Sequence, residues 1–178
     1  SHRLPIAEVA ADKGIDMTVF TDFTKSHDET YNGFTLQKSP IARTLGGFFS
    51  IFKEFFQLFR LIRSEQPSVI HAVTIKPIIF LGIICFILRI PFIGSISGLG
   101  PAFTSNSFKG KARLFVIKLI YRIIFSPKKV RIICQSSHDA KALIDNNLVL
   151  ENKITMTEGS GVDLEKYKPK KDRASKQI

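Results

Sequence analysis

The feature that most constrains the fold is a regular alternation of strand-like and helix-like segments along the chain. This alternation is typical of βαβ units, in which helices cover both faces of a parallel sheet. The sequence therefore predicts an α/β fold. The expected helices lie at 4–13, 45–63, 77–89, 111–125 and 136–146, and the expected strands at 15–21, 34–37, 68–73, 91–96, 130–135 and 153–157.

The start of the chain is unusual for such a fold, because it opens on a helical pattern with no strand before it. The first strand of a doubly wound sheet is central and its following loop is often functional. We therefore expect that the first strand lies upstream of Ser1. A length of 178 residues suits one domain. We assign residues 1–167 to that domain and residues 168–178 to a charged tail.

Positive charge is concentrated in the middle of the chain. Residues 31–137 hold fifteen basic residues and only two acids, Glu54 and Glu65, whereas the two flanks together carry a net charge of −2. The same segment holds most of the 16 phenylalanines. Basic residues interleaved with Phe and Ile favour an anionic membrane surface as the partner. Interleaving with polar residues would instead have favoured nucleic acid.

The helix at 45–63 and the basic residues near 109–122 are the candidate membrane-binding elements. Eight apolar positions of the first helix follow three- and four-residue spacing, which is equally typical of a helix that covers a core. Any single cation could also belong to an ordinary solvated face. The candidate membrane-binding residues are Phe48, Phe52, Phe55, Phe56, Phe59, Arg60, Arg63, Lys109, Lys111, Lys118 and Arg122.

Several other classes of site and protein are disfavoured. The apolar run 78–88 is too short to span a bilayer, which takes about 20 apolar residues. Cys85 and Cys134 lie in apolar strings and are predicted to be buried thiols of a reducing compartment. The four histidines show no metal-ligand spacing, so we predict neither a metal site nor a cofactor.

Four motifs occur in the order found in bacterial family 4 glycosyltransferases. They are Ser-His-Arg-Leu-Pro-Ile-Ala at 1–7, Val-Ile-His-Ala-Val-Thr-Ile-Lys-Pro at 69–77, Ile-Ser-Gly-Leu-Gly at 96–100 and Gly-Ser-Gly-Val-Asp-Leu-Glu at 159–165. The chain most resembles members that extend undecaprenyl-diphosphate-linked saccharides for capsule, O-antigen or glycan assembly. The resemblance covers essentially the whole chain.

The resemblance implies one half of a GT-B fold, which has two Rossmann-like domains around a cleft. The chain is similar to the N-terminal, acceptor-binding domain. In the family, a Glu-x7-Glu motif holds the nucleotide-sugar, which is expected to be a UDP-sugar. No such motif follows Asp163 in this sequence. The resemblance thus implies that a C-terminal donor domain acts in cis or in trans, and that this chain alone is inactive.

Ligands of parallel α/β sheets bind beyond the carboxyl ends of the strands. The resemblance implies that residues at these strand ends contact the acceptor. Ser97 stands where many relatives have a histidine, and serine is no base at neutral pH, so the catalytic residue stays unknown. The candidate acceptor-binding residues are Ser1, His2, Arg3, Thr74, Lys76, Ser97, Gly98, Gly100 and Gln135.

The expected function is therefore retaining sugar transfer from a nucleotide-sugar to a lipid-diphosphate saccharide. The protein would be cytoplasmic and peripheral on the inner face of the cell membrane. One alternative is a non-catalytic, membrane-anchoring subunit that recruits a separate donor-domain protein. A basic nucleic-acid-binding module is a further alternative, which the Phe-rich surroundings of the cations disfavour.

Overall fold

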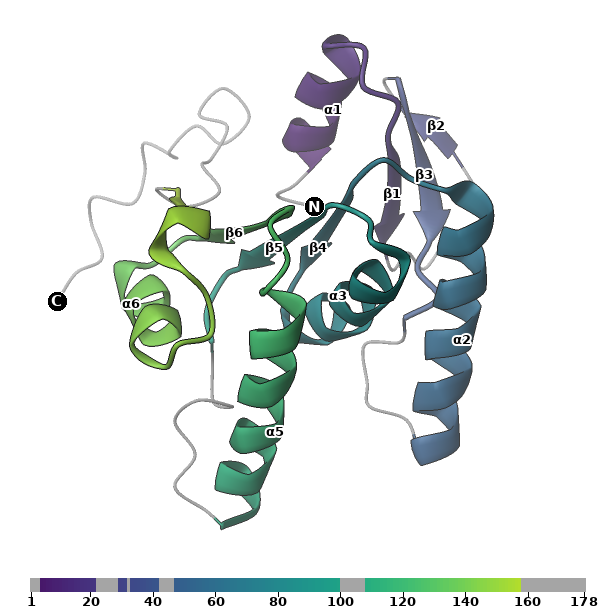
Figure 1. The fold of residues 1–178 in the computed structure, drawn as a ribbon. Helices are drawn as coiled ribbons and strands as arrows, with labels where there is room; N and C mark the ends of the chain where they lie inside the picture. Colours follow the sequence, from purple (N-terminus) through teal and green to yellow (C-terminus); the bar gives the residue numbers. More distant parts are fainter. Residues whose placement is uncertain (1–3, 22–28, 32, 42–46, 100–107, 158–178) are drawn as a thin grey trace, which may run out of the picture.

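The structure is a computed structural model of the chain and describes residues 4–21, 29–31, 33–41, 47–99 and 108–157. Two sheets and their flanking helices make up this part of the molecule (Figure 1). The helices are α1 (Leu4–Asp12), α2 (Phe48–Glu65), α3 (Ile75–Leu88), α5 (Phe108–Ile124), α6 (Ser137–Asp145) and the short 3-10 helix η1 (Glu151–Lys153). The strands are β1 (Thr18–Thr21), β2 (Glu29–Tyr31), β3 (Phe34–Lys38), β4 (Ile70–Val73), β5 (Phe92–Ile96), β6 (Val130–Cys134) and β7 (Ile154–Met156).

The larger sheet has four strands in the order β4-β5-β6-β7. All three neighbouring pairs are parallel. Helices α3, α5 and α6 each lie between consecutive strands in the chain, so every connection is a strand–helix–strand crossover. The predicted α/β fold with a parallel sheet flanked by helices is confirmed.

The smaller sheet has the order β1-β3-β2. Strand β1 is parallel to β3, whereas β2 pairs with β3 in the antiparallel sense. The sequence patterns predict no strand between residues 22 and 33, so strand β2 corrects that expectation. The polar composition of that segment concealed the strand, but the Asn-Gly pair at 32–33 is a strong hairpin signal, and Gly33 has the positive φ of 87° that such turns require.

Element boundaries differ from the predicted ones for local reasons. Helix α3 begins at Ile75, two residues before Pro77, because proline is tolerated throughout the first helical turn. Helix α5 begins at Phe108 rather than at residue 111. The predicted strand at 15–21 is shorter, because the Ile15 N–H still donates to the Ala10 carbonyl and continues the turn that ends α1.

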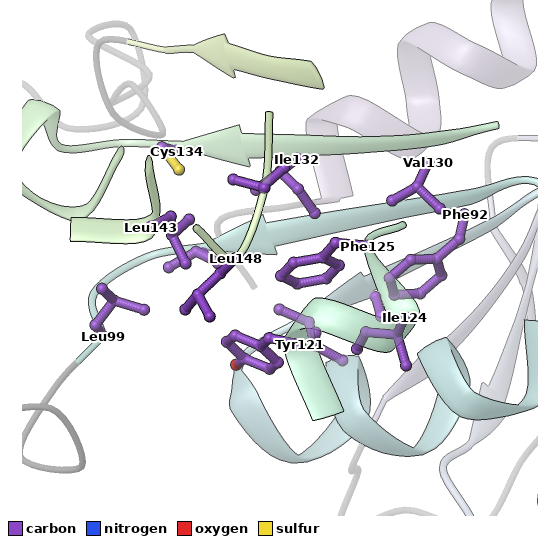
Figure 2. Packing of buried hydrophobic residues seen from close by; sticks show 14 of the residues in the cluster. Phe92, Leu99, Tyr121, Ile124, Phe125, Val130, Ile132, Cys134, Leu143 and Leu148 are labelled. Atoms are coloured by element: carbon purple, nitrogen blue, oxygen red, sulfur yellow. The ribbon is translucent and has the colours of Figure 1, made fainter. Parts of the chain in front are cut away.

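The main hydrophobic core lies on one face of the larger sheet. Phe92 and Ile96 of β5 lie on the same face as the β6 residues Val130 and Cys134 with which they pair. Helices α3, α5 and α6 all contribute side chains to the same cluster. Figure 2 shows Tyr121 and Phe125 of this cluster near each other beside the sheet. Their ring centroids are 4.8 Å apart and their planes are tilted by 37°.

Both cysteines are free and buried, as predicted. Burial raises the pKa of Cys85 to about 12. The pKa of Cys134 rises to about 11, because of burial and then because of the nearby negative charge of Asp139. Neither thiol is therefore a nucleophile at neutral pH.

Candidate functional site

The candidate site is the carboxyl edge of the four-stranded sheet. Because the strands are parallel and adjacent, the residues that follow them meet along one edge of the sheet. These residues include four positions that the sequence singled out, together with the first turn of helix α3. The positions on this edge are Thr74 after β4, Ser97 and Gly98 after β5, Gln135 and Ser136 after β6, and Thr157 after β7.

Thr74 joins β4 to helix α3 in an unusual backbone conformation. Its φ of 72° and ψ of 161° lie where residues other than glycine are rarely found, which is most costly for a β-branched residue. The Thr74 N–H donates to the carbonyl of Ser95 on the neighbouring strand, at 3.3 Å. Strain of this kind is held by its surroundings and is concentrated at functional sites.

The loop after β5 is anchored by helix α6. Ser97 and Gly98 are exposed, and Gly98 has a φ of 123° that favours glycine. The next residue, Leu99, is buried, and its N–H donates to Oδ1 of Asp139 at 3.1 Å. Asp139 lies in the first turn of α6, next to the sheet edge. The loop therefore presents its first two residues from a fixed position.

Asp139 is a site-supporting residue that the sequence analysis missed. The available signal was Ser136 followed by Asp139 three positions later, the pattern of a helix start. In the structure Ser136 is indeed the N-cap, and its Oγ accepts from the His138 N–H at 3.2 Å. The Asp139 carboxylate accepts a hydrogen bond from the β5 loop, a contact 40 residues away that no local pattern reveals. Gln135, just before the cap, is half-buried.

Lys76 lies in the first turn of α3 but is engaged by a second residue that the sequence analysis did not select. Its Nζ is 2.9 Å from Oε2 of Glu54 on helix α2. The same Nζ lies 5.7 Å from the centroid of the Phe80 ring. The side chains of Lys76 and Glu54 are only 17% and 9% exposed, so the ammonium is held in place and not freely solvated.

Some of the predicted site residues lie outside the described part of the chain. The structure describes neither Ser1, His2, Arg3 nor Gly100. It also does not describe the side chains of Phe48 and Lys109, although both residues belong to helices.

Helix α2 separates its phenylalanines between the core and the surface. Leu58 and Ile62 are buried against α3, and Phe55 and Phe59 are half-buried beside them. Phe49, Phe52 and Phe56 are the exposed ones; their exposures are 89%, 47% and 58%. Helix α3 packs on only one side of this wide apolar arc, which leaves the other phenylalanines exposed. Arg60 and Arg63 are exposed, as are Lys53 and Gln57.

Helix α5 adds a second exposed apolar stripe, which the sequence analysis missed. Phe115, Val116, Leu119 and Ile123 follow helical spacing, and each is 46% exposed or more. The helical spacing of these four apolar residues is already visible in the sequence. No acidic residue occurs in α5, and the two acids of α2 are Glu54, which is buried, and Glu65. We call the exposed apolar and basic residues of α2 and α5 the two-helix surface.

Two of the predicted membrane-binding cations contact helix α6 in the structure. Lys118 donates to Oδ1 of Asn146 at 2.7 Å. Arg122 donates to the carbonyls of Asn146 and Asn147, both at 3.3 Å. These carbonyls end α6, and cations are favourable at that end of a helix dipole. Lys111, in contrast, is exposed.

No group of His, Cys, Asp and Glu among the described residues could hold a metal ion. Among the described helices, none is long and apolar enough to cross a bilayer. His71 of β4 forms a hydrogen bond between its Nε2 and Oγ of Ser95 on β5, at 2.6 Å.

The parallel four-stranded sheet with its crossover helices defines a Rossmann-like domain of the α/β class. The sequence profile of a family described as glycosyl transferase 4-like matches residues 1–136. The chain belongs to this glycosyltransferase family. No curated protein matches the chain.

Proposed function

We propose that the chain is the acceptor-binding half of a retaining glycosyltransferase. It binds an undecaprenyl-diphosphate-linked saccharide, of the capsule, O-antigen or related lipid-linked type, at the cytoplasmic face of the inner membrane. A donor domain, in cis or in trans, supplies the nucleotide-sugar, a UDP-sugar. The observation that carries this proposal is the combination of a ligand-binding sheet edge with the two-helix surface in one glycosyl transferase 4-like domain.

The two-helix surface supports a lipid-linked acceptor for a physical reason. Exposed Phe and Leu side chains gain free energy on entering the acyl boundary, and each Lys or Arg near an anionic leaflet adds about 1 kcal/mol. Glu54 is buried, which leaves Glu65 as the acid of these two helices that could repel such a leaflet. A soluble acceptor would give no reason for this surface.

The edge residues support an anionic headgroup. Thr74 offers a hydroxyl at the N-terminus of helix α3, where backbone dipoles favour negative charge. Lys76 adds a cation in the same turn, and the Ser97-Gly98 loop offers backbone and a hydroxyl without steric bulk. The undescribed Ser1, His2, Arg3 and Gly100 stay predicted acceptor contacts.

Transfer is tested by incubating the chain with UDP-sugars and a polyprenyl-diphosphate saccharide, and by detecting the extended product by mass spectrometry. The expected result is one added sugar once a donor domain is present. If the chain binds vesicles but never supports transfer with any donor-domain protein, the enzymatic proposal fails and the anchoring subunit becomes the better explanation.

Membrane docking is tested separately by co-sedimentation with vesicles of phosphatidylglycerol or of phosphatidylcholine. We expect binding to the anionic vesicles at low salt and its loss at high salt. The triple variant Phe49→Ser, Phe52→Ser, Phe56→Ser should weaken binding at least about tenfold, because apolar burial is lost. The matched control is Ile6→Ser with Val9→Ser, which removes exposed apolar side chains from α1. Equal binding by all three proteins would contradict docking through α2.

A further inference from the structure

Glu54 occupies a position where helix α2 should carry an apolar residue. It forms one row with Leu58 and Ile62, spaced by four residues, and all three are buried. Glu54 itself is only 7% exposed. A buried carboxylate is costly unless charged or hydrogen-bonding groups compensate it.

Two partners compensate the Glu54 carboxylate. Oε1 accepts from Oγ of Ser50, one turn earlier, at 3.3 Å, and Oε2 pairs with Nζ of Lys76 at 2.9 Å. Solvent screens this ion pair little, because both side chains are mostly buried. The position of the Lys76 ammonium is therefore determined by helix α2, not by α3 alone.

Packing of α2 on α3 gives no reason for this ion pair. Leu58 and Ile62 already contact Phe80 and Ile84 of α3 in one apolar cluster. Buried ion pairs usually stabilise a protein no better than apolar replacements of the same volume. In addition, Lys76 lies in the first turn of α3, where the helix dipole disfavours a cation. A role for the ammonium at the sheet edge explains why both costs are tolerated.

We propose that Glu54 is a positioning residue, whose carboxylate holds the Lys76 ammonium at the carboxyl edge of the sheet to bind the acceptor diphosphate. This inference rests on the proposed function. Phe52 and Phe56, which flank Glu54 on α2, are exposed on the two-helix surface. One helix therefore carries lipid-facing side chains on one side and the counter-ion of an acceptor-binding cation on the other.

The first test is Glu54→Gln, which keeps the shape and removes the charge. In the transfer assay with a donor-domain protein present, we expect the acceptor KM to rise about tenfold, with a smaller change in kcat and an unchanged KM for the nucleotide-sugar. Glu65→Gln is the matched control, because it removes the same charge from an exposed position at the end of the same helix. A purely structural role would lower the melting temperature and the active fraction without a selective change in acceptor KM.

The second test is the exchanged pair Glu54→Lys with Lys76→Glu, measured together with each single variant. The exchange restores the attraction between α2 and α3, so its melting temperature should exceed that of either single variant. It should not restore acceptor binding, because a carboxylate then stands where the diphosphate needs a cation. Recovery of both properties, or an unchanged acceptor KM in Glu54→Gln, would overturn the inference.

The failure of the proposed function has a different signature. In that case the wild-type chain itself would not bind a short-chain polyprenyl diphosphate in a calorimetric titration, and the inference would fall with it. If the wild type binds and Glu54→Gln binds equally well, only the inference fails. Should the exchanged pair not fold, Lys76→Met supplies the same comparison, with loss of acceptor binding expected and undiminished binding as the contrary result.

Discussion

The two sheets of this molecule differ in the hydrophobic core that supports them. Among the described residues, the four-stranded sheet rests on a cluster of seventeen buried residues from strands β4, β5 and β6, from three helices and from the loops between them. In the described part of the chain, the three-stranded sheet has a buried cluster of three residues, namely Ala7, Phe34 and Leu36. The candidate site lies at the carboxyl edge of the four-stranded sheet. Sites that must hold groups within fractions of an ångström are better built on such well-packed elements.

The difference also concerns how each sheet is connected. In the larger sheet, the helices between the strands pack on the same face of the sheet and share one core. In the smaller sheet, α1 precedes β1 and contributes Ala7 to the core. Strand β1 leaves Phe20 40% exposed. The smaller sheet is therefore expected to open at lower free energy than the larger one.

The largest effect is expected from truncating the two aromatic residues at the centres of these cores. Phe92 is 1% exposed and Phe34 is 2% exposed, so the two sites are matched in chemistry and burial. Phe92→Ala should lower the free energy of unfolding by about 3–5 kcal/mol, and Phe34→Ala by less, because its smaller surroundings can collapse or admit water. Urea unfolding followed by circular dichroism measures both. Equal losses would contradict the contrast between the two cores.

The second prediction concerns Lys153, a buried lysine in the part of the molecule built around the four-stranded sheet. Lys153 Nζ donates to the carbonyls of Phe125, Ser126 and Pro127 at 2.8–2.9 Å, which fixes the end of helix α5. Lys153→Met should lower the free energy of unfolding by about 1.5–3 kcal/mol, because the carbonyls lose a charged donor.

The control is Lys141→Met, which removes an exposed lysine from α6 and should change the stability by less than about 0.5 kcal/mol. Similar effects of the two variants in the same urea titration would show that the three hydrogen bonds of Lys153 contribute little.

The third prediction concerns the stability of the fold at alkaline pH. It applies to the four-stranded sheet and its helices, because both cysteines lie in the core of that sheet. The folded-state pKa values of Cys85 and Cys134, about 12 and about 11, exceed the ordinary value of 9.0. Above pH 9 the unfolded chain releases thiol protons that the folded chain keeps, so stability falls as pH rises, by up to about 1.4 kcal/mol per pH unit for each thiol.

The double variant Cys85→Ala, Cys134→Ala should remove this decline. Lys153 acts in the opposite direction: burial, and then the charge of Arg131, lower its pKa, so its titration raises stability with pH. Free energies of unfolding at about pH 8 and about pH 10 test the difference. An equal alkaline decline in the double variant would mean that the thiols do not cause it.

Much of the four-stranded sheet and its helices could be predicted from the sequence, because the sequence patterns of these elements are local. Strands of three to five residues alternate with helices of nine to seventeen residues, and each predicted strand from β4 to β7 is present. The parallel arrangement then followed from the alternation alone. In the three-stranded sheet, polar residues surround β2. Its strand conformation follows from pairing with β3 and not from intrinsic strand propensity.

The supporting residues of the site could not be predicted, because they act across long stretches of sequence. Glu54 meets Lys76 only when α2 packs on α3, and Asp139 meets Leu99 only when α6 packs at the sheet edge. The sequence did show that Glu54 interrupts an apolar row, which marks an anomaly but not its partner. The edge positions themselves, such as Thr74, followed from strand ends and needed no tertiary contact to be found.

The last comparison concerns two glycines, one beside each sheet, where the backbone alone decides the cost of a substitution. A Cβ at Gly14 or at Gly98 would meet no atom within 4 Å, so packing does not contribute. Gly14 has a φ of 75°, which is left-handed helical, and Gly14→Ala should cost about 1 kcal/mol. Gly98 has a φ of 123°, which side chains rarely adopt, so Gly98→Ala should cost more, up to about 3 kcal/mol, unless the loop shifts.

A shift of that loop is itself informative, because Leu99 anchors its far end through Asp139. If the loop moves to relieve Gly98→Ala, the stability loss will be small but the acceptor KM should rise. If it does not move, the stability loss will exceed that of Gly14→Ala and the KM will stay unchanged. Urea unfolding and acceptor titration, measured on both variants, distinguish the two outcomes. A small stability loss with an unchanged KM would show that neither the φ of Gly98 nor the position of its loop matters for the site.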